Sequence, residues 1–149
     1  MTRDHPQRIT PPAPVGSQLK DFSPAAVRVK IKQETERDAA YLEKVRLCPC
    51  LYCEKDEAHE AAHVRYASAA FGKASGLGKK PADRFAVPLC PDDHRIALHA
   101  QHRHNEEAWW ISVGINPLLV AERMWAQRDD LEAMRKVVVQ AIAEKTRGP

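Results

Sequence analysis

Apolar residues recur at helical spacing in the segment before the cysteines. Ala39, Leu42 and Val45 lie three residues apart within residues 34–47, and Pro49 follows as a stop signal. One face of a helix repeats in this way, so the pattern predicts a helix over about residues 34–47.

The C-terminal third carries a second helical pattern. Pro117 is suited to the first turn of a helix that runs to about Gln127, and Asp129 is a suitable N-cap for another that reaches about Lys145. The apolar residues of the last helix form one stripe, made of Leu131, Met134, Val138 and Ile142. We therefore expect two C-terminal helices with a shared apolar side.

Short strands are predicted where apolar residues alternate or cluster. Residues 26–32 alternate apolar and basic side chains, and residues 61–66 and 84–89 are the expected halves of a hairpin. Between the halves, residues 71–81 contain three glycines and three lysines, a composition typical of a mobile loop. A short helix is expected after Cys90.

The length of 149 residues favours one domain with attached tails. Residues 1–26 are rich in proline and poor in periodic apolar pattern, so we expect a disordered basic arm there. Residues 27–149 then form the domain, with its core at about residues 50–105 and a helical extension at about residues 106–146.

Composition and charge narrow the function classes. No apolar run approaches the roughly 18 residues needed to span a bilayer, and the N-terminus lacks the apolar stretch of a signal peptide. We therefore expect a cytoplasmic protein without a membrane partner. The net charge of +3 is concentrated in residues 1–32 and 60–104, which permits a nucleic-acid partner without requiring one.

The cysteines provide the strongest chemical signal. Cys50 and Cys53 are separated by two residues, a spacing that lets both thiolates reach one zinc ion, and Cys90 precedes a histidine-rich segment that can supply further ligands. Grouped cysteines in a reducing compartment favour metal over disulfides. Cys48 is interpreted as a thiol outside the site.

Two histidines complete the candidate site. His63 lies between the two cysteine groups, and His94 follows Cys90 by four residues. A zinc ion that joins the start of the hairpin to the following helix would bring these histidines to one cleft, where one can take a proton from water and the other can hold a divalent cation.

Several short motifs, in this order, resemble a known family. The runs are RDAAYLEKVRLCPCLYC, EAAHVR, KKPADRFAVPLC, DDHR and AQHRHNEEAWW, followed by VGINPLLVAERMWA. They resemble phage and prophage HNH-nuclease domains, including the Ref-type RecA-dependent nucleases, over about residues 37–125. The resemblance implies an α+β fold: a small zinc-stabilised ββα-metal (HNH) nuclease core with flanking helices.

The resemblance also implies residue roles. His63 matches the histidine that activates the attacking water, and Asp83 is placed to orient it. His94 matches the histidine that binds a catalytic Mg²⁺ or Mn²⁺ ion, and His102 matches a further downstream metal-binding histidine.

At two positions the sequence departs from the family. Relatives usually have a histidine where Asp93 stands, so the fourth ligand of the structural zinc is open between Asp93, His99 and His102. Many HNH enzymes carry a metal-binding aspartate where Ala62 stands. The catalytic ion is therefore expected to be held mainly by histidines.

Basic residues near the motifs are candidates for contacts to DNA phosphates, namely Arg65, Lys73, Lys79, Lys80 and Arg84. Trp109 and Trp110 adjoin apolar residues and are assigned to packing.

We expect a metal-dependent HNH endonuclease that hydrolyses DNA phosphodiester bonds, with a role in phage recombination or DNA processing. The alternative is a zinc-stabilised DNA- or partner-binding module without cleavage, which Ala62 and Asp93 favour. A RecA-type recombinase filament is a further expected partner on the resemblance alone, and the pattern leaves the oligomeric state open.

Overall fold

The computed structural model describes residues 36–74 and 80–145. The helices are α2 (Ala39–Arg46), α3 (Glu106–Val113), α4 (Pro117–Ala126) and α5 (Leu131–Lys145), the strands are β1 (Glu60–His63) and β2 (Ala86–Leu89), and the short turns are η2 (Ala69–Phe71), η3 (Asp83–Phe85), η4 (Asp92–Ile96) and η5 (Gln101–Arg103). Among the sequence predictions, the arm at 1–26, the strand at 26–32 and Lys79 lie outside the described residues.

Helix α2 begins later than its apolar pattern indicated. The Asp38 side chain accepts a hydrogen bond from the Tyr41 backbone N–H at 2.9 Å, which caps the first turn at Ala39. Residues 36–38 are therefore not helical, and the predicted start at residue 34 is wrong for that part. The helix ends at Arg46, ahead of Pro49.

The predicted hairpin is present as a two-stranded antiparallel sheet. Glu60 pairs with Leu89 and His63 pairs with Ala86, so β1 starts beside the end of β2. Both strands are shorter than predicted: β1 ends at His63, and residues 83–85 form the turn η3 instead of extending β2. Pro88 has no N–H to donate, and its carbonyl accepts from the Leu51 N–H at 3.1 Å, which ties the cysteine segment to β2.

The helical extension contains one helix, α3, that the apolar pattern had not predicted. Asn105 accepts from the Ala108 N–H at 3.0 Å and so caps α3, and Gly114 ends the helix in a left-handed conformation with φ 74°. Asn116 caps α4 and Pro117 occupies its first turn, as predicted. The predicted cap of α5 is corrected from Asp129 to Asp130, whose carboxylate accepts from the Ala133 N–H.

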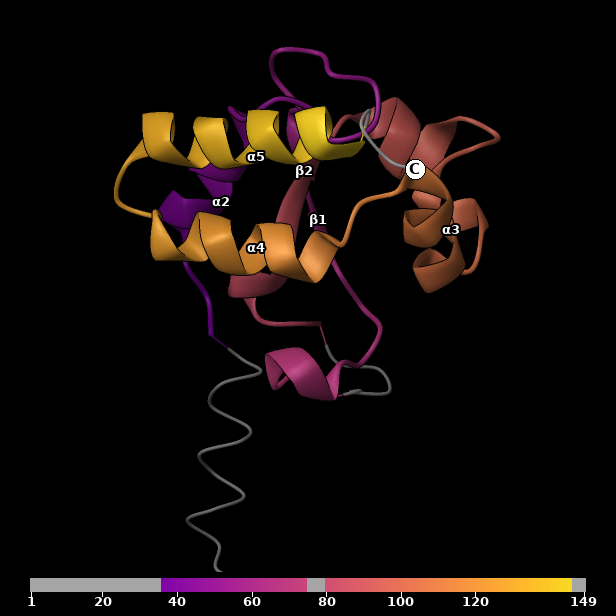
Figure 1. The fold of residues 1–149 in the computed structure, drawn as a ribbon, viewed down its shortest axis with the longest axis horizontal. Helices are drawn as coiled ribbons and strands as arrows, with labels where there is room; N and C mark the ends of the chain where they lie inside the picture. Colours follow the sequence, from indigo (N-terminus) through magenta and orange to yellow (C-terminus); the bar gives the residue numbers. More distant parts are fainter. Residues whose placement is uncertain (1–35, 75–79, 146–149) are drawn as a thin grey trace, which may run out of the picture.

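The core lies between the strands and the helices. Figure 1 shows α4 and α5 side by side, with the two strands and α2 behind them. Side chains from each of these elements are fully buried, including Val45, Val87, Met124, Met134 and Val138. Trp109 and Trp110 are 6% and 1% exposed, which agrees with their assignment to packing.

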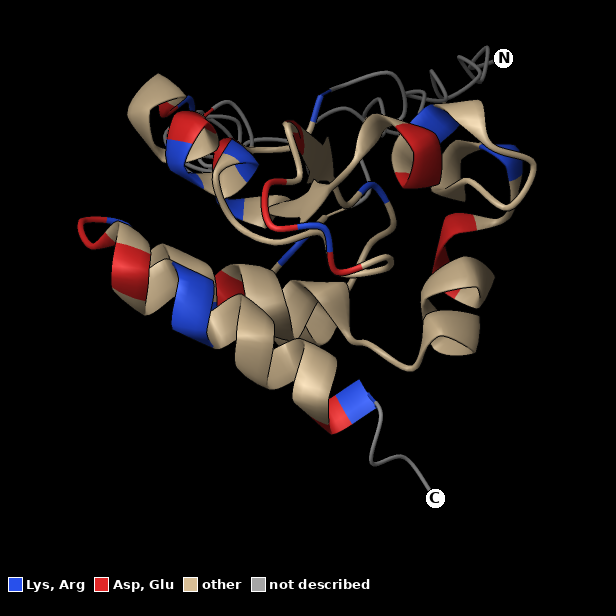
Figure 2. Ribbon diagram, turned by 90° about the horizontal axis from the view of Figure 1, so that it is seen from above, with Lys and Arg blue, Asp and Glu red and all other residues tan. Residues whose placement is uncertain are grey.

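The described surface carries charges of both signs. Figure 2 shows acidic and basic residues interspersed along the ribbon. Of the helices in the described ranges, none has the length and apolar character needed to cross a membrane.

Candidate functional site

A tight turn brings Cys50 and Cys53 together after α2. The Glu54 N–H donates to the Cys50 carbonyl at 3.0 Å, and the Cys50 N–H donates to the Lys55 carbonyl at 2.9 Å. Glu54 adopts φ 66°, a left-handed conformation that costs a residue with a side chain roughly 1–2 kcal/mol. The turn that brings both thiols to the same side therefore includes one strained backbone position.

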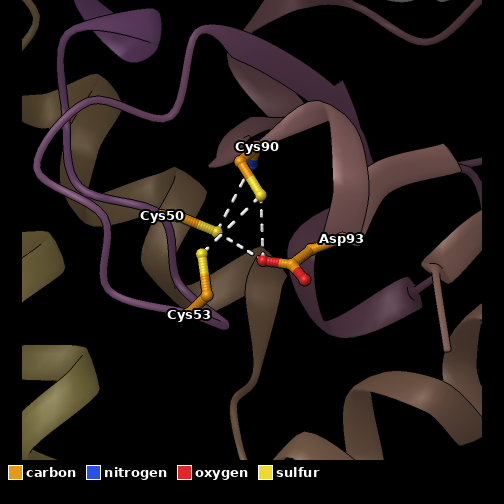
Figure 3. Close-up of side chains that lie close together, drawn as sticks. All are labelled: Cys50, Cys53, Cys90 and Asp93. Carbon is orange, nitrogen blue, oxygen red and sulfur yellow. Dashed lines mark hydrogen bonds between the residues drawn. The ribbon is translucent and has the colours of Figure 1, made fainter. Parts of the chain in front are cut away.

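Four side chains meet in one cluster, formed by Cys50, Cys53, Cys90 and Asp93, whose candidate ligand atoms all lie within 4.8 Å of one another (Figure 3). The Cys53 and Cys90 sulfurs are 3.6 Å apart, and Asp93 Oδ2 lies 3.0 Å from the Cys90 sulfur and 3.2 Å from the Cys50 sulfur. The turn after α2 supplies the first two thiols, and the end of β2 and turn η4 supply the other two ligands.

The dimensions of this cluster fit a tetrahedral ion. Zinc–sulfur bonds of about 2.3 Å place two thiolate sulfurs about 3.8 Å apart, close to the 3.6 Å that separates Cys53 from Cys90. Three thiolates and one carboxylate are all ligand types that zinc takes. The cluster can therefore hold a metal ion, with Asp93 as the fourth candidate ligand.

The cysteine thiols of the cluster are protonated without a metal, so metal binding would release protons. Burial, together with the hydrogen bond to Asp93, raises the pKa of Cys53 and of Cys90 to about 11. Burial alone would raise the pKa of Asp93, but hydrogen bonds from Cys53, Cys90 and His99 outweigh it and lower this pKa to about 2. The metal-free thiols are thus neutral, whereas a bound cation would favour their thiolate forms.

His99 and His102, the two other candidates for the fourth ligand, lie outside the cluster. His99 Nε2 is 2.8 Å from Asp93 Oδ1, so His99 contacts the ligand carboxylate from outside the cluster. The ring of His102 packs edge-on against that of His94, with centroids 4.4 Å apart. The geometry thus selects Asp93 from the three alternatives.

Replacing Asp93 with alanine is expected to lower zinc retention strongly, while Asp93→Cys should preserve it because a fourth thiolate completes the same tetrahedron. His99→Ala should weaken affinity by about 10-fold to 100-fold, the usual effect of losing a group that orients a ligand. Elemental analysis after graded chelator treatment measures both effects. If His102→Ala loses zinc and Asp93→Ala retains it, the assignment is wrong.

His63 and Asp83 form a second, separate pair. His63 Nε2 lies 2.8 Å from Asp83 Oδ1, and the imidazole is 12% exposed. Asp83 lies in turn η3, and its other oxygen, Oδ2, accepts from the Asp38 N–H at 2.9 Å, while the Arg37 guanidinium donates at 3.2 Å to Oδ1, the oxygen that His63 contacts. The N-terminal end of α2 therefore positions the carboxylate that contacts His63.

Electrostatics favour an ionised aspartate beside a neutral histidine. Burial lowers the pKa of His63, and the hydrogen bond to Asp83 offsets this only in part. Burial would raise the pKa of Asp83, but the hydrogen bonds from His63 and from the Asp38 N–H outweigh it, so this pKa is lowered. An ionised carboxylate can only accept, so His63 donates through Nε2–H and keeps its lone pair on Nδ1.

His94 has a partner that the sequence analysis missed. Glu60 Oε2 lies 2.7 Å from His94 Nδ1, and Arg95 donates to both oxygens of the same carboxylate, at 2.9 Å and 3.2 Å through Nε. Burial would raise the pKa of Glu60, but the hydrogen bonds from Arg95 and His94 outweigh it and lower the pKa. One signal for Glu60 was present in the sequence. Glu60 lies two residues before Ala62 in EAAHVR, so in a strand its carboxylate is on the same face as the position where a metal-binding aspartate was expected.

The three residues expected to be catalytic thus fall into two groups joined by β1. Glu60 opens the strand beside turn η4, and His63 ends it beside η3. Residues three apart in a strand point to opposite faces. Within residues 36–74 and 80–145 no hydrogen bond or ring contact joins His63 to His94, so the structure does not show the single cleft that the sequence predicted for them. Across residues 36–74 and 80–145, no second set of three metal-ligating side chains is as close as the cysteine cluster.

The basic candidates differ in their surroundings. Lys73 is only 6% exposed and its Nζ donates to the Arg65 carbonyl at 3.0 Å, so its burial argues against the expected phosphate contact. Lys80 is exposed, and the Arg84 guanidinium lies over the Phe85 ring at 5.1 Å. Arg65 is exposed and lines a cavity of about 260 Å³ together with Gln101, His102, His104 and Glu106.

Comparison with known proteins gives a family but no activity. Neither the curated proteins nor the solved structures yielded a match. Residues 12–124 match the family described as "Protein of unknown function (DUF968)". That match covers most of the sequence, and the chain therefore belongs to the DUF968 family.

Proposed function

We propose that the protein is a metal-dependent endonuclease of the HNH type that hydrolyses phosphodiester bonds in DNA. The observation that carries the proposal is the His63–Asp83 pair, 2.8 Å apart at the end of a short hairpin whose other end adjoins a four-ligand metal cluster. A largely shielded histidine that is held neutral and oriented by a carboxylate is suited to general-base chemistry.

His63 acts as the base in this proposal. Asp83 accepts the Nε2–H bond and fixes the tautomer, so that Nδ1 takes the proton from the attacking water. Arg37 and the Asp38 N–H hold the carboxylate in place.

His94 and His102 would hold the catalytic divalent ion. Their rings lie in contact, and Mg²⁺ and Mn²⁺ bind with few protein ligands when water and phosphate complete the shell. When bound, such an ion stabilises negative charge on the phosphate and on the leaving oxygen.

Three cations remain as proposed phosphate contacts. Arg65 lies near His102, and Lys80 and Arg84 flank the segment that carries Asp83. Because phosphate attraction is independent of sequence, these contacts would position DNA without selecting bases.

Nicking of supercoiled plasmid by the zinc-loaded protein, with and without Mg²⁺ or Mn²⁺, tests the activity. Ion-dependent conversion to open circles is expected. DNA binding without conversion would instead favour the module that binds DNA but does not cleave it, for which the absence of a ligand side chain at Ala62 is the supporting observation.

The cleavage rate is expected to depend on pH through His63. Because burial lowers the pKa of this histidine from its usual 6.5, the neutral base persists below pH 6.5, and protonation abolishes it only under more acidic conditions. The acid limb of the rate at saturating metal should therefore be centred below about pH 6.5. An acid limb centred well above pH 6.5 would contradict this assignment.

A recombinase filament is proposed as a partner on the resemblance to RecA-dependent nucleases. Cleavage of displaced-strand DNA, measured with and without a RecA-type filament on the invading strand, tests the proposal. A rate that does not respond to the filament would exclude this dependence.

A further inference from the structure

Glu60 is placed by strand pairing to reach turn η4. Its register partner Leu89 precedes Cys90, after which the chain enters η4 and reaches His94 and Arg95. The carboxylate is 20% exposed and the His94 side chain 13% exposed, so their contact is largely shielded from water.

The direction of the proton in this contact follows from the surroundings of Glu60. Arg95 donates from Nε and Nη2, and the shortest of these contacts is 2.5 Å, to Oε1. A carboxylate that is ion-paired in this way acts only as an acceptor. His94 must therefore donate through Nδ1–H, and Nε2 is the ring nitrogen whose lone pair a cation can take.

Nε2 is the nitrogen left for a cation, since Nδ1 is engaged with Glu60 at 2.7 Å. The ring of His102 adjoins the same imidazole, with the two centroids 4.4 Å apart. Histidines that bind metals usually donate their other ring N–H to a carboxylate or carbonyl, which fixes the tautomer and raises ligand basicity.

We propose that Glu60 is a positioning residue that holds His94 in the Nδ1–H tautomer, with Nε2 directed to a divalent cation. The inference rests on the proposed function, because it assigns His94 to the catalytic ion. Glu60 acts through His94 and does not itself bind the ion, since His94 and Arg95 already engage both of its oxygens.

The test uses full-length, zinc-loaded protein and two measurements that do not require cleavage. Nitrogen-15 NMR of the imidazole rings, with the His94 signals identified by their loss in His94→Gln, gives the tautomer. Titration with Mn²⁺ alone, followed by the EPR signal of the free ion, gives the affinity. The variants are Glu60→Ala, Glu60→Gln and the control Glu57→Gln, which changes an exposed carboxylate three residues earlier.

The wild type and the control should show His94 protonated at Nδ1 and should bind Mn²⁺ with equal affinity. Glu60→Ala should move the proton to Nε2 and weaken Mn²⁺ binding by about 10-fold to 100-fold. Glu60→Gln keeps a carbonyl acceptor and should recover part of the affinity and the native tautomer.

Three results overturn the inference. Wild-type protein that binds Mn²⁺ with His94 protonated at Nε2, or a Glu60→Ala variant with undiminished affinity, removes the role of Glu60 and leaves the nuclease proposal standing. Wild-type protein that holds no Mn²⁺ in either the presence or the absence of DNA overturns the proposed ion-dependent function together with this inference.

Discussion

Cys90→Ser is expected to leave the protein unfolded at 37 °C, without a cooperative melting transition. Zinc at structural sites of this type supplies about 10–16 kcal/mol of folding free energy, comparable with or larger than the about 5–15 kcal/mol net stability of a whole domain. Cys90 is 2% exposed and follows β2 directly, so losing its thiolate removes the ligand that links the end of β2 to the ion held by Cys50 and Cys53. Thermal melting and elemental analysis of the same samples measure the effect.

Cys48→Ser is the matched control. Cys48 is fully buried but lies outside the cluster, and its sulfur is 3.4 Å from the Lys44 carbonyl, to which a serine hydroxyl can also donate. Its zinc content should equal that of the wild type, and its melting temperature should fall only slightly. A control that loses zinc while Cys90→Ser retains it would show that the ligand set is wrong.

The elements that were predictable from sequence are those with a local chemical cause. The cap at Asn116 with Pro117, the stop before Pro49 and the two-residue gap between Cys50 and Cys53 each act within a few residues, and each is found as expected. Helix α3 also had local signals, at Asn105 and Gly114, but its apolar residues surround the helix and give no clear amphipathic stripe.

The parts of the site that were not predictable depend on contacts distant in sequence. The Glu60–His94 contact joins residues 34 apart, and only the register of β1 against β2 brings them together. The choice of Asp93 over His99 and His102 is likewise made by the backbone of η4, because all three residues have suitable ligand atoms. The sequence around Lys73, AAFGKASG, carries no signal that this side chain is buried.

His63→Ala is expected to lower the proposed cleavage rate by about 10²-fold to 10⁴-fold, the usual range when a general base is removed. The substitution takes away the only nitrogen assigned to accept the proton from water, and leaves the cysteine cluster and the exposed cations Arg65 and Lys80 unchanged. Folding, zinc content and DNA affinity should therefore be near wild type. A plasmid-nicking time course under matched metal and salt measures the rate.

His63→Asn distinguishes a chemical role from a packing role, because the asparagine amide can still donate to Asp83 Oδ1 but has no basic lone pair. This variant should be as slow as His63→Ala while melting closer to the wild type. His59→Ala, at an exposed histidine four residues earlier, controls for the loss of a histidine near the site and should cleave at the wild-type rate. Asp83→Asn should also be slow, because its amide group can donate to His63 and so favour the tautomer with the proton on Nδ1. If His63→Asn instead nicks plasmid as fast as the wild type, with contaminating nuclease excluded by the His63→Ala preparation, then the pair with Asp83 is structural and the base must be another group.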